Sequence, residues 1–206
     1  MAVVHRVLRH AMAALILTAV AVQFRNPADP WAAAPNFFSF FTIQSNIYAA
    51  CVLLVVALGA TSRGTRLELF RGAATLYLLI TGVVFALLLS NLPEDLQLTL
   101  PWVDTVLHQV APVVLVLDWL VDPPRTRIAP RTALLWLAYP LAYVAYTLIR
   151  GAIVGWYPYP FLDVDAHGYG AVLLGCLGLL VGFVLAALAV AAAGNRLGAR
   201  ARASTE

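Results

Sequence analysis

Residues 169–193 read YGAVLLGCLGLLVGFVLAALAVAAA and contain no charged side chain. An α-helix needs about 20 mainly apolar residues to cross the hydrocarbon core of a bilayer. A lone strand of this composition would leave its backbone groups unpaired in lipid, where only helices and closed barrels satisfy them. The stretch therefore predicts a transmembrane helix.

Five further apolar segments of similar length precede it, separated by short connections that are polar or contain proline. The 206-residue chain is 62% hydrophobic and 11% charged, whereas soluble domains are about 45–50% apolar and about 25% charged. We therefore expect an all-α polytopic membrane protein with one six-helix domain over residues 1–206. The expected spans are about 7–24, 38–60, 72–90, 101–121, 132–150 and 169–193.

The arginines predict the orientation of this bundle. Counted over alternate connections and both termini, eleven of them fall on one side, and only Arg25 and Arg150 fall on the other. Cytoplasmic segments carry the excess of Lys and Arg in membrane proteins. We therefore expect a plasma (inner) membrane protein with both termini in the cytoplasm. The amino-acid composition, rich in Ala and Arg and free of Lys, suggests a bacterial source. Short Arg clusters between apolar runs also argue against nucleic acid as a partner.

The first span has an alternative interpretation as a signal peptide. Arg6 and Arg9 precede an apolar run that ends near Ala19-Val20-Ala21, which is similar to a cleavage site. No polar region precedes that site, and we expect the first helix to be retained.

Polar residues at membrane depth are costly and often functional. Ser39, Thr42 and Asn46 in the second span are spaced i, i+3, i+7 and would share one helical face. They predict either a polar pocket, in which Ser39 would contact a substrate, or hydrogen bonds between helices.

The fourth span contains His108, with Asp104 one helical turn before it. That carboxylate could accept the imidazole N–H and fix the tautomer of the ring, unless the histidine is simply a satisfied core residue. At about 1.5 Å per residue, Thr42 lies about 6 Å and His108 about 10 Å below the same predicted boundary. The two side chains could meet if the second and fourth spans are neighbours.

The same end of the predicted bundle holds further candidate substrate-binding residues. Tyr146 and Arg150 lie on one face of the fifth span, and Trp156 and Tyr157 follow in an aromatic, proline-rich connection. Arg150 either extends to the lipid headgroups or binds an anionic group of a substrate. The aromatic connection is typical of a membrane interface and could cover a pocket.

Three short motifs and the six-span pattern resemble a known family. The motifs are the Phe-rich segment 37–46 with Thr42, His108 with Pro112, and Gly-Trp-Tyr-Pro at 155–158. Together they resemble the androgen-induced protein family, which includes the androgen-dependent TFPI-regulating protein, and its bacterial six-span relatives. The resemblance implies an intramembrane hydrolase of fatty acid esters of hydroxy fatty acids, with Thr42 as the nucleophile and His108 as the base.

The expected function is therefore lipid ester hydrolysis, with no metal and no cofactor. His108, oriented by Asp104, would take the proton of Thr42, and Ser45 or Asn46 would donate to the oxyanion. The partners would be the bilayer and a membrane lipid or fatty-acyl ester.

The alternative is a non-enzymatic transporter or lipid-binding protein with a polar central cavity. Pro112 and Pro140 interrupt two spans. In many transporters such interruptions occur at corresponding positions of an internal repeat, but this sequence shows no matching repeat.

Overall fold

A computed structural model describes residues 2–26, 34–59, 64–91 and 100–203. Within these ranges the regular structure is entirely helical, and six helical segments are long and apolar enough to cross a membrane. They are α1 (Ala2–Phe24); α3 (Phe41–Gly59); α4 (Thr65–Val84), extended by a π-helical turn (Phe85–Leu89); α5 (Pro101–Thr105), a π-helical turn (Val106–Val110) and α6 (Ala111–Val121); α7 (Pro130–Leu134), a 3-10 turn (Leu135–Leu137) and α8 (Ala138–Val154); and α9 (Val164–Ala203). The short helix α2 (Ala34–Phe37) precedes α3, and a 3-10 turn (Pro160–Leu162) precedes α9.

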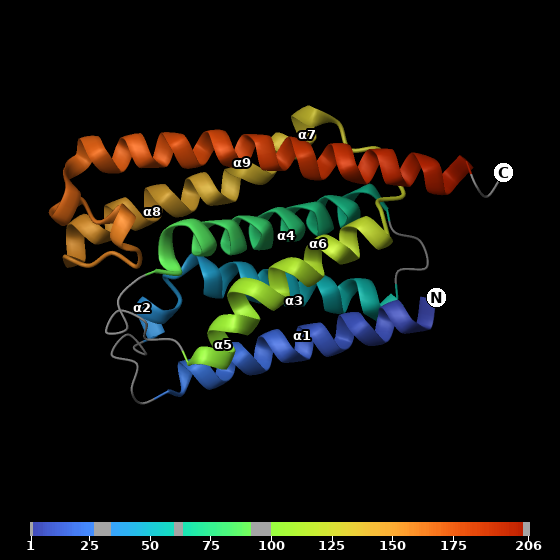
Figure 1. Cartoon of the computed structure of the whole chain (residues 1–206), viewed down its shortest axis with the longest axis horizontal. Coiled ribbons are helices and arrows are strands. Elements are labelled where there is room, and N and C mark those ends of the chain that lie inside the picture. The colour runs from blue at the N-terminus through green and yellow to red at the C-terminus, as the bar shows by residue number, and fades with distance from the viewer. Residues whose placement is uncertain (1, 27–33, 60–63, 92–99, 204–206) are drawn as a thin grey trace.

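The helices run back and forth between two ends of the bundle (Figure 1). Both chain termini lie at one end, here named the terminal end, together with the first turns of α4 and the connection between α6 and α7. The opposite end holds α2, α5 and the connection between α8 and α9. We call it the aromatic end, because residues 155–163 lie there.

The six helical segments overlap the six predicted spans, but some of their ends differ by up to ten residues. The third span was expected to begin at residue 72, but α4 begins at Thr65, because Glu68 and Arg71 pair within the helix. The second begins at Phe41, which leaves Ser39 in the turn after α2 rather than on the face of α3. The last extends over Val164–Ala203, with a break in helical geometry at Gly168.

Pro140 shows how the bundle accommodates a proline within a span. Proline has no N–H, so the carbonyl of Trp136, four residues earlier, loses its helical partner. The 3-10 turn Leu135–Leu137 lies at this point, and the hydroxyl of Tyr77 on α4 donates to the Trp136 carbonyl at 2.9 Å. A buried carbonyl in an apolar surrounding is thereby satisfied.

The helix α9 lies along the edge of the bundle (Figure 1). Its terminal-end half is anchored: the indole of Trp119 donates to Val190 O at 2.9 Å, and Asn195 pairs with the backbone of Ile128 through two bonds of 2.8 Å. Large apolar side chains such as Leu174 and Val181 are exposed along the helix. Such a surface suits contact with lipid, since lipid tails are themselves apolar.

Candidate functional site

Thr42, His108 and Asp104 meet at the aromatic end of the bundle. Thr42 Oγ1 lies 3.1 Å from His108 Nε2, and His108 Nδ1 lies 2.9 Å from Asp104 Oδ1. These distances are within hydrogen-bond range, the geometry required of a nucleophile, its base and the group that orients the base. Helices α3 and α5 with its π-helical continuation, which are distant in sequence, supply the three side chains.

The position of each hydrogen in the series Asp104, His108 and Thr42 follows from which of these groups can donate and which can accept. An ionised carboxylate can only accept, so the contact with Asp104 places the hydrogen of a neutral imidazole on Nδ1. Nε2 is then the acceptor, and Thr42 Oγ1–H donates to it. The arrangement can therefore move a proton from the threonine hydroxyl to the imidazole.

Pro112 helps to explain the position of His108. It lacks the N–H that would bond to the His108 carbonyl four residues earlier, and its ring crowds that carbonyl. The preceding turn, Val106–Val110, is π-helical rather than α-helical, a distortion often found at functional sites. Phe85, in the π-helical turn that extends α4, stacks on the imidazole with ring centroids 4.2 Å apart and planes 10° apart. The ring is thus held on one face by an aromatic side chain and at both nitrogens by polar partners.

Asn46 and Ser45 lie one turn deeper and are completely buried. Asn46 Nδ2 donates to Thr42 O at 2.9 Å and to Leu107 O at 3.2 Å, which ties the helix that carries Thr42 to the turn that carries His108. Ser45 Oγ lies 3.2 Å from Thr42 O and 3.1 Å from Thr81 Oγ1. Both residues therefore brace the site, and their donor groups face backbone carbonyls or Thr81.

Tyr159 is a further polar partner of Thr42. Its Oη lies 3.3 Å from Thr42 Oγ1 and accepts from Thr42 N–H at 3.2 Å. Its ring packs edge-on against Phe40 and stacks on Phe161, with centroids 5.7 and 5.3 Å apart. Burial raises the pKa of this phenol, which keeps it protonated and able to donate.

Two glycines allow the connection 155–163 to fold back toward Thr42. Gly155 ends α8 with φ +65°, a conformation that other residues rarely adopt. The ring of Tyr157 then lies directly on Gly151, where an added Cβ would be 2.0 Å from a ring carbon. Tyr157 thus fastens the connection to α8, and Tyr159, two residues later, reaches Thr42.

Ser39, Tyr146 and Arg150 make polar contacts between α8 and the segment that precedes α3. Ser39 Oγ donates to Pro35 O at 2.6 Å and lies 3.2 Å from Tyr146 Oη. Arg150 donates to Asn36 Oδ1 at 2.6 Å, and its guanidinium lies 5.2 Å from the centre of the Trp156 ring. Arg150 therefore folds onto side chains of this protein instead of extending away from it.

Sequence reasoning missed Tyr159, Asn36 and Phe85. Tyr159 belongs to the connection that was expected to cover a pocket, but nothing in the spacing distinguished it from Trp156 or Tyr157. Asn36 stands six residues before Thr42, on the same periodic pattern as Ser39, and that pattern could have indicated it. Phe85 carries no polar group and gave no signal.

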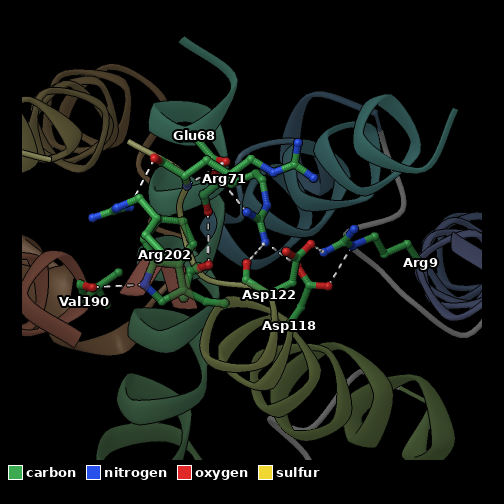
Figure 2. A network of polar contacts seen from close by, with 10 residues as sticks. Arg9, Glu68, Arg71, Asp118, Asp122, Val190 and Arg202 are labelled. Atoms are coloured by element: carbon green, nitrogen blue, oxygen red, sulfur yellow. Dashed lines mark hydrogen bonds and ion pairs between the residues drawn. The ribbon is translucent and has the colours of Figure 1, made fainter. Parts of the chain in front are cut away.

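A second polar cluster lies at the terminal end and was also missed (Figure 2). Arg9 on α1 pairs with Asp118 at 2.7 Å and Asp122 at 2.6 Å. Arg71 on α4 pairs with Glu68 at 2.8 Å and Asp118 at 3.0 Å, and it also donates to Asp122 O at 2.9 Å. The sequence had assigned these arginines to connections and a terminus, but both lie within helices and are buried. We name these five residues the charged cluster.

In the described part of the chain, no three His, Cys, Asp or Glu side chains form a group that could hold a metal ion. The chain matches no family model, no curated protein and no solved structure. Its six apolar helices give it the fold of a multi-pass membrane protein.

Proposed function

We propose that this protein is an intramembrane lipid ester hydrolase in which Thr42 is the nucleophile and His108 the general base. The observation that carries the proposal is the unbroken hydrogen-bonded chain from Asp104 through His108 to Thr42. The resemblance to the androgen-induced protein family supports the same roles. It also favours fatty acid esters of hydroxy fatty acids as substrates.

The reaction proceeds in two halves. Thr42 Oγ1 bonds to the ester carbonyl carbon as its proton passes to His108 Nε2, and the tetrahedral intermediate then loses the alcohol, which takes that proton. Water next attacks the acyl-threonine and gives a proton to His108. The fatty acid leaves when the carbon–Oγ1 bond breaks and Thr42 regains its hydrogen. Asp104 holds Nε2 toward Thr42 and stabilises the imidazolium in both halves.

Arg150 at the aromatic end of α8 suits the free carboxylate of such a substrate. Arg150 Nη1 is buried and has no hydrogen-bond partner in the described part of the chain, so the guanidinium retains a donor for an anion. Ser39 contacts Tyr146, one turn from Arg150 on α8, and Trp156 lies against the Arg150 guanidinium. Tyr157 contributes by holding this side of the connection on α8.

The protein lies in the bacterial plasma (inner) membrane with the terminal end in the cytoplasm and the site near the outer surface. Eleven of the thirteen arginines belong to the termini, the connections and the adjoining helix ends on the side assigned to the cytoplasm, which supports this orientation.

Hydrolysis by the purified protein in lipid nanodiscs tests the proposal. The wild type should release free hydroxy fatty acid from such an ester. Thr42→Ala and His108→Ala should each lose nearly as much activity as the double variant, because the effects of substitutions within one catalytic unit are strongly non-additive. Ser90→Ala, which removes a hydroxyl that only bonds Ala86 O within its own helix, is the control.

Full activity in both single variants would place the site elsewhere. A wild type that cleaves no lipid ester would favour the non-enzymatic transporter or lipid-binding interpretation.

A further inference from the structure

Two side chains of the described residues contact Thr42 Oγ1, and the proposed proton relay does not use the hydroxyl of one of them, Tyr159. His108 and Tyr159 both contact this oxygen, at 3.1 and 3.3 Å. His108 receives the proton in the proposed mechanism. The role of Tyr159 is therefore open.

The hydrogens available on Thr42 and Tyr159 determine which group donates in each hydrogen bond between them. Thr42 is the second residue of α3, and the first four N–H groups of a helix have no carbonyl partner within it. Thr42 N–H instead donates to Tyr159 Oη. The hydroxyl hydrogen of Thr42 goes to His108 Nε2, so the hydrogen of Tyr159 points to Thr42 Oγ1.

Attack on an ester creates a negative charge on the carbonyl oxygen, and donors already in place for it provide much of the catalysis. The Asn46 amide is one turn away and donates to two backbone carbonyls, and Ser45 Oγ lies beside Thr42 O and Thr81. Two donors lie beside Thr42 Oγ1: the Tyr159 hydroxyl, which contacts that oxygen, and the N–H of Thr42, which donates to Tyr159 Oη. When Oγ1 becomes bonded to carbon, the new oxyanion lies beside that oxygen and within reach of both.

We propose that Tyr159 is a catalytic residue whose hydroxyl turns from Thr42 Oγ1 to the carbonyl oxygen of the ester and, with Thr42 N–H, stabilises the oxyanion. This inference rests on the proposed function. Tyr159 keeps its proton throughout: it donates a hydrogen bond that is strongest in the tetrahedral intermediate, while the transferred proton passes only between Thr42, His108, the alcohol and water. The packing against Phe40 and Phe161 fixes the ring, so only the O–H bond has to rotate.

Tyr159→Phe tests the proposal, because it removes the hydroxyl and keeps the ring in its packing. Loss of one oxyanion donor typically lowers kcat by about 100- to 1,000-fold. KM should change little, since the lost bond forms mainly in the transition state. The control is Tyr77→Phe, because Tyr77 is also buried and its hydroxyl donates to the backbone carbonyl of Trp136, not to Thr42.

An inhibitor series separates catalysis from structure. A trifluoromethyl ketone that carries the acyl chain forms a tetrahedral adduct with the nucleophile and should lose affinity for Tyr159→Phe in parallel with kcat. The corresponding ether, which cannot form an oxyanion, should bind the variant as it binds the wild type. Tyr77→Phe should leave both affinities unchanged.

The outcomes are distinct. An active wild type together with a fully active Tyr159→Phe would overturn the role of Tyr159 and leave the proposed function standing. Equal losses in the two Phe variants, or equal losses of ketone and ether binding, would mean that Tyr159 only supports the structure, and would also overturn its catalytic role. A wild type that neither hydrolyses esters nor binds the ketone would end the proposed function and the role of Tyr159 with it.

Discussion

At the scale of the residue, the site depends on which atom of each polar side chain carries a hydrogen. Asp104 fixes the hydrogen of His108 on Nδ1, and that leaves Nε2 free to receive the proton of Thr42. A threonine hydroxyl is a weak nucleophile until an adjacent base takes its proton. The proposed catalysis therefore rests on the tautomer of one imidazole.

Asp104→Asn tests this dependence. The asparagine has nearly the same shape, but its NH2 group can donate to Nδ1 and so hold the hydrogen on Nε2, the wrong nitrogen. We expect kcat for ester hydrolysis to fall by about tenfold to about 10⁴-fold, as in hydrolases whose orienting carboxylate is replaced by its amide. The change should leave substrate binding nearly intact, as measured by the affinity of the ether analogue.

Asp163→Asn is the matched control at the same end of the bundle. The Asp163 carboxylate caps the first turn of α9 by accepting from the N–H groups of Asp165 and Ala166, whereas the polar partners of the His108 ring are Asp104 and Thr42. If both substitutions lower kcat equally, the orienting role of Asp104 is wrong.

At the scale of the element, the charged cluster joins three helices at the terminal end. Arg9 comes from α1, Glu68 and Arg71 from α4, and Asp118 from α6. The Arg71 guanidinium also lies 5.5 Å from the centre of the Trp119 ring, whose N–H holds α9 through Val190. Buried charges in this setting are tolerated because each has a partner, and the removal of one member leaves the others uncompensated.

Arg71→Met should therefore destabilise the bundle strongly. Breaking a buried ion pair costs about 3–5 kcal/mol, mostly because the remaining charge stays buried without its partner. The free energy of unfolding in mixed micelles measures this loss. Arg66→Met, which removes an exposed arginine from the same helix, is the control and should cost less than about 1 kcal/mol. Equal losses in the two variants would show that the charged cluster does not hold the helices together.

At the scale of the whole molecule, the two polar clusters lie at opposite ends of an apolar bundle. The terminal end holds the charged cluster (Figure 2), and the aromatic end, where α3 and α5 begin (Figure 1), holds the candidate site. The proposed orientation places the first in the cytoplasm and the second near the outer surface. Substrate, water and product then all reach the site from the outer leaflet.

Cysteine labelling in intact cells tests this orientation. In a background without Cys51 and Cys176, a membrane-impermeant maleimide should label Ala34→Cys and Asp165→Cys, both exposed at the aromatic end. It should not label Thr65→Cys or Arg127→Cys, both exposed at the terminal end, until the cells are opened. The reverse pattern would invert the topology.

The six spans were predictable because apolarity over about 20 residues is a local property of the sequence. The Asp104–His108 pair was predictable for a similar reason, since side chains four residues apart share a helical face. The spans of α4 and α9 were placed too short, because charged residues at their ends counted as connections. In the folded chain, some of those charges are paired inside the helices.

Contacts that depend on the path of a connection could not be predicted. Tyr159 reaches Thr42 because Gly155 turns the backbone and Tyr157 fits against Gly151, and neither contact follows from periodicity. The charged cluster depends on which helices are neighbours, and an arginine count gives only the side of the membrane. The catalytic roles of Thr42 and His108 remain predictions.

The most direct measurement of the central claim is the site of covalent modification by a fluorophosphonate probe, which reacts with activated hydroxyl nucleophiles. The purified protein should gain the mass of one probe, mapped by peptide mass spectrometry to Thr42, and excess lipid ester should prevent the reaction. The adduct should be absent in Thr42→Ala and strongly reduced in His108→Ala. A probe that modifies another hydroxyl, or that modifies Thr42 equally well without His108, would contradict the account.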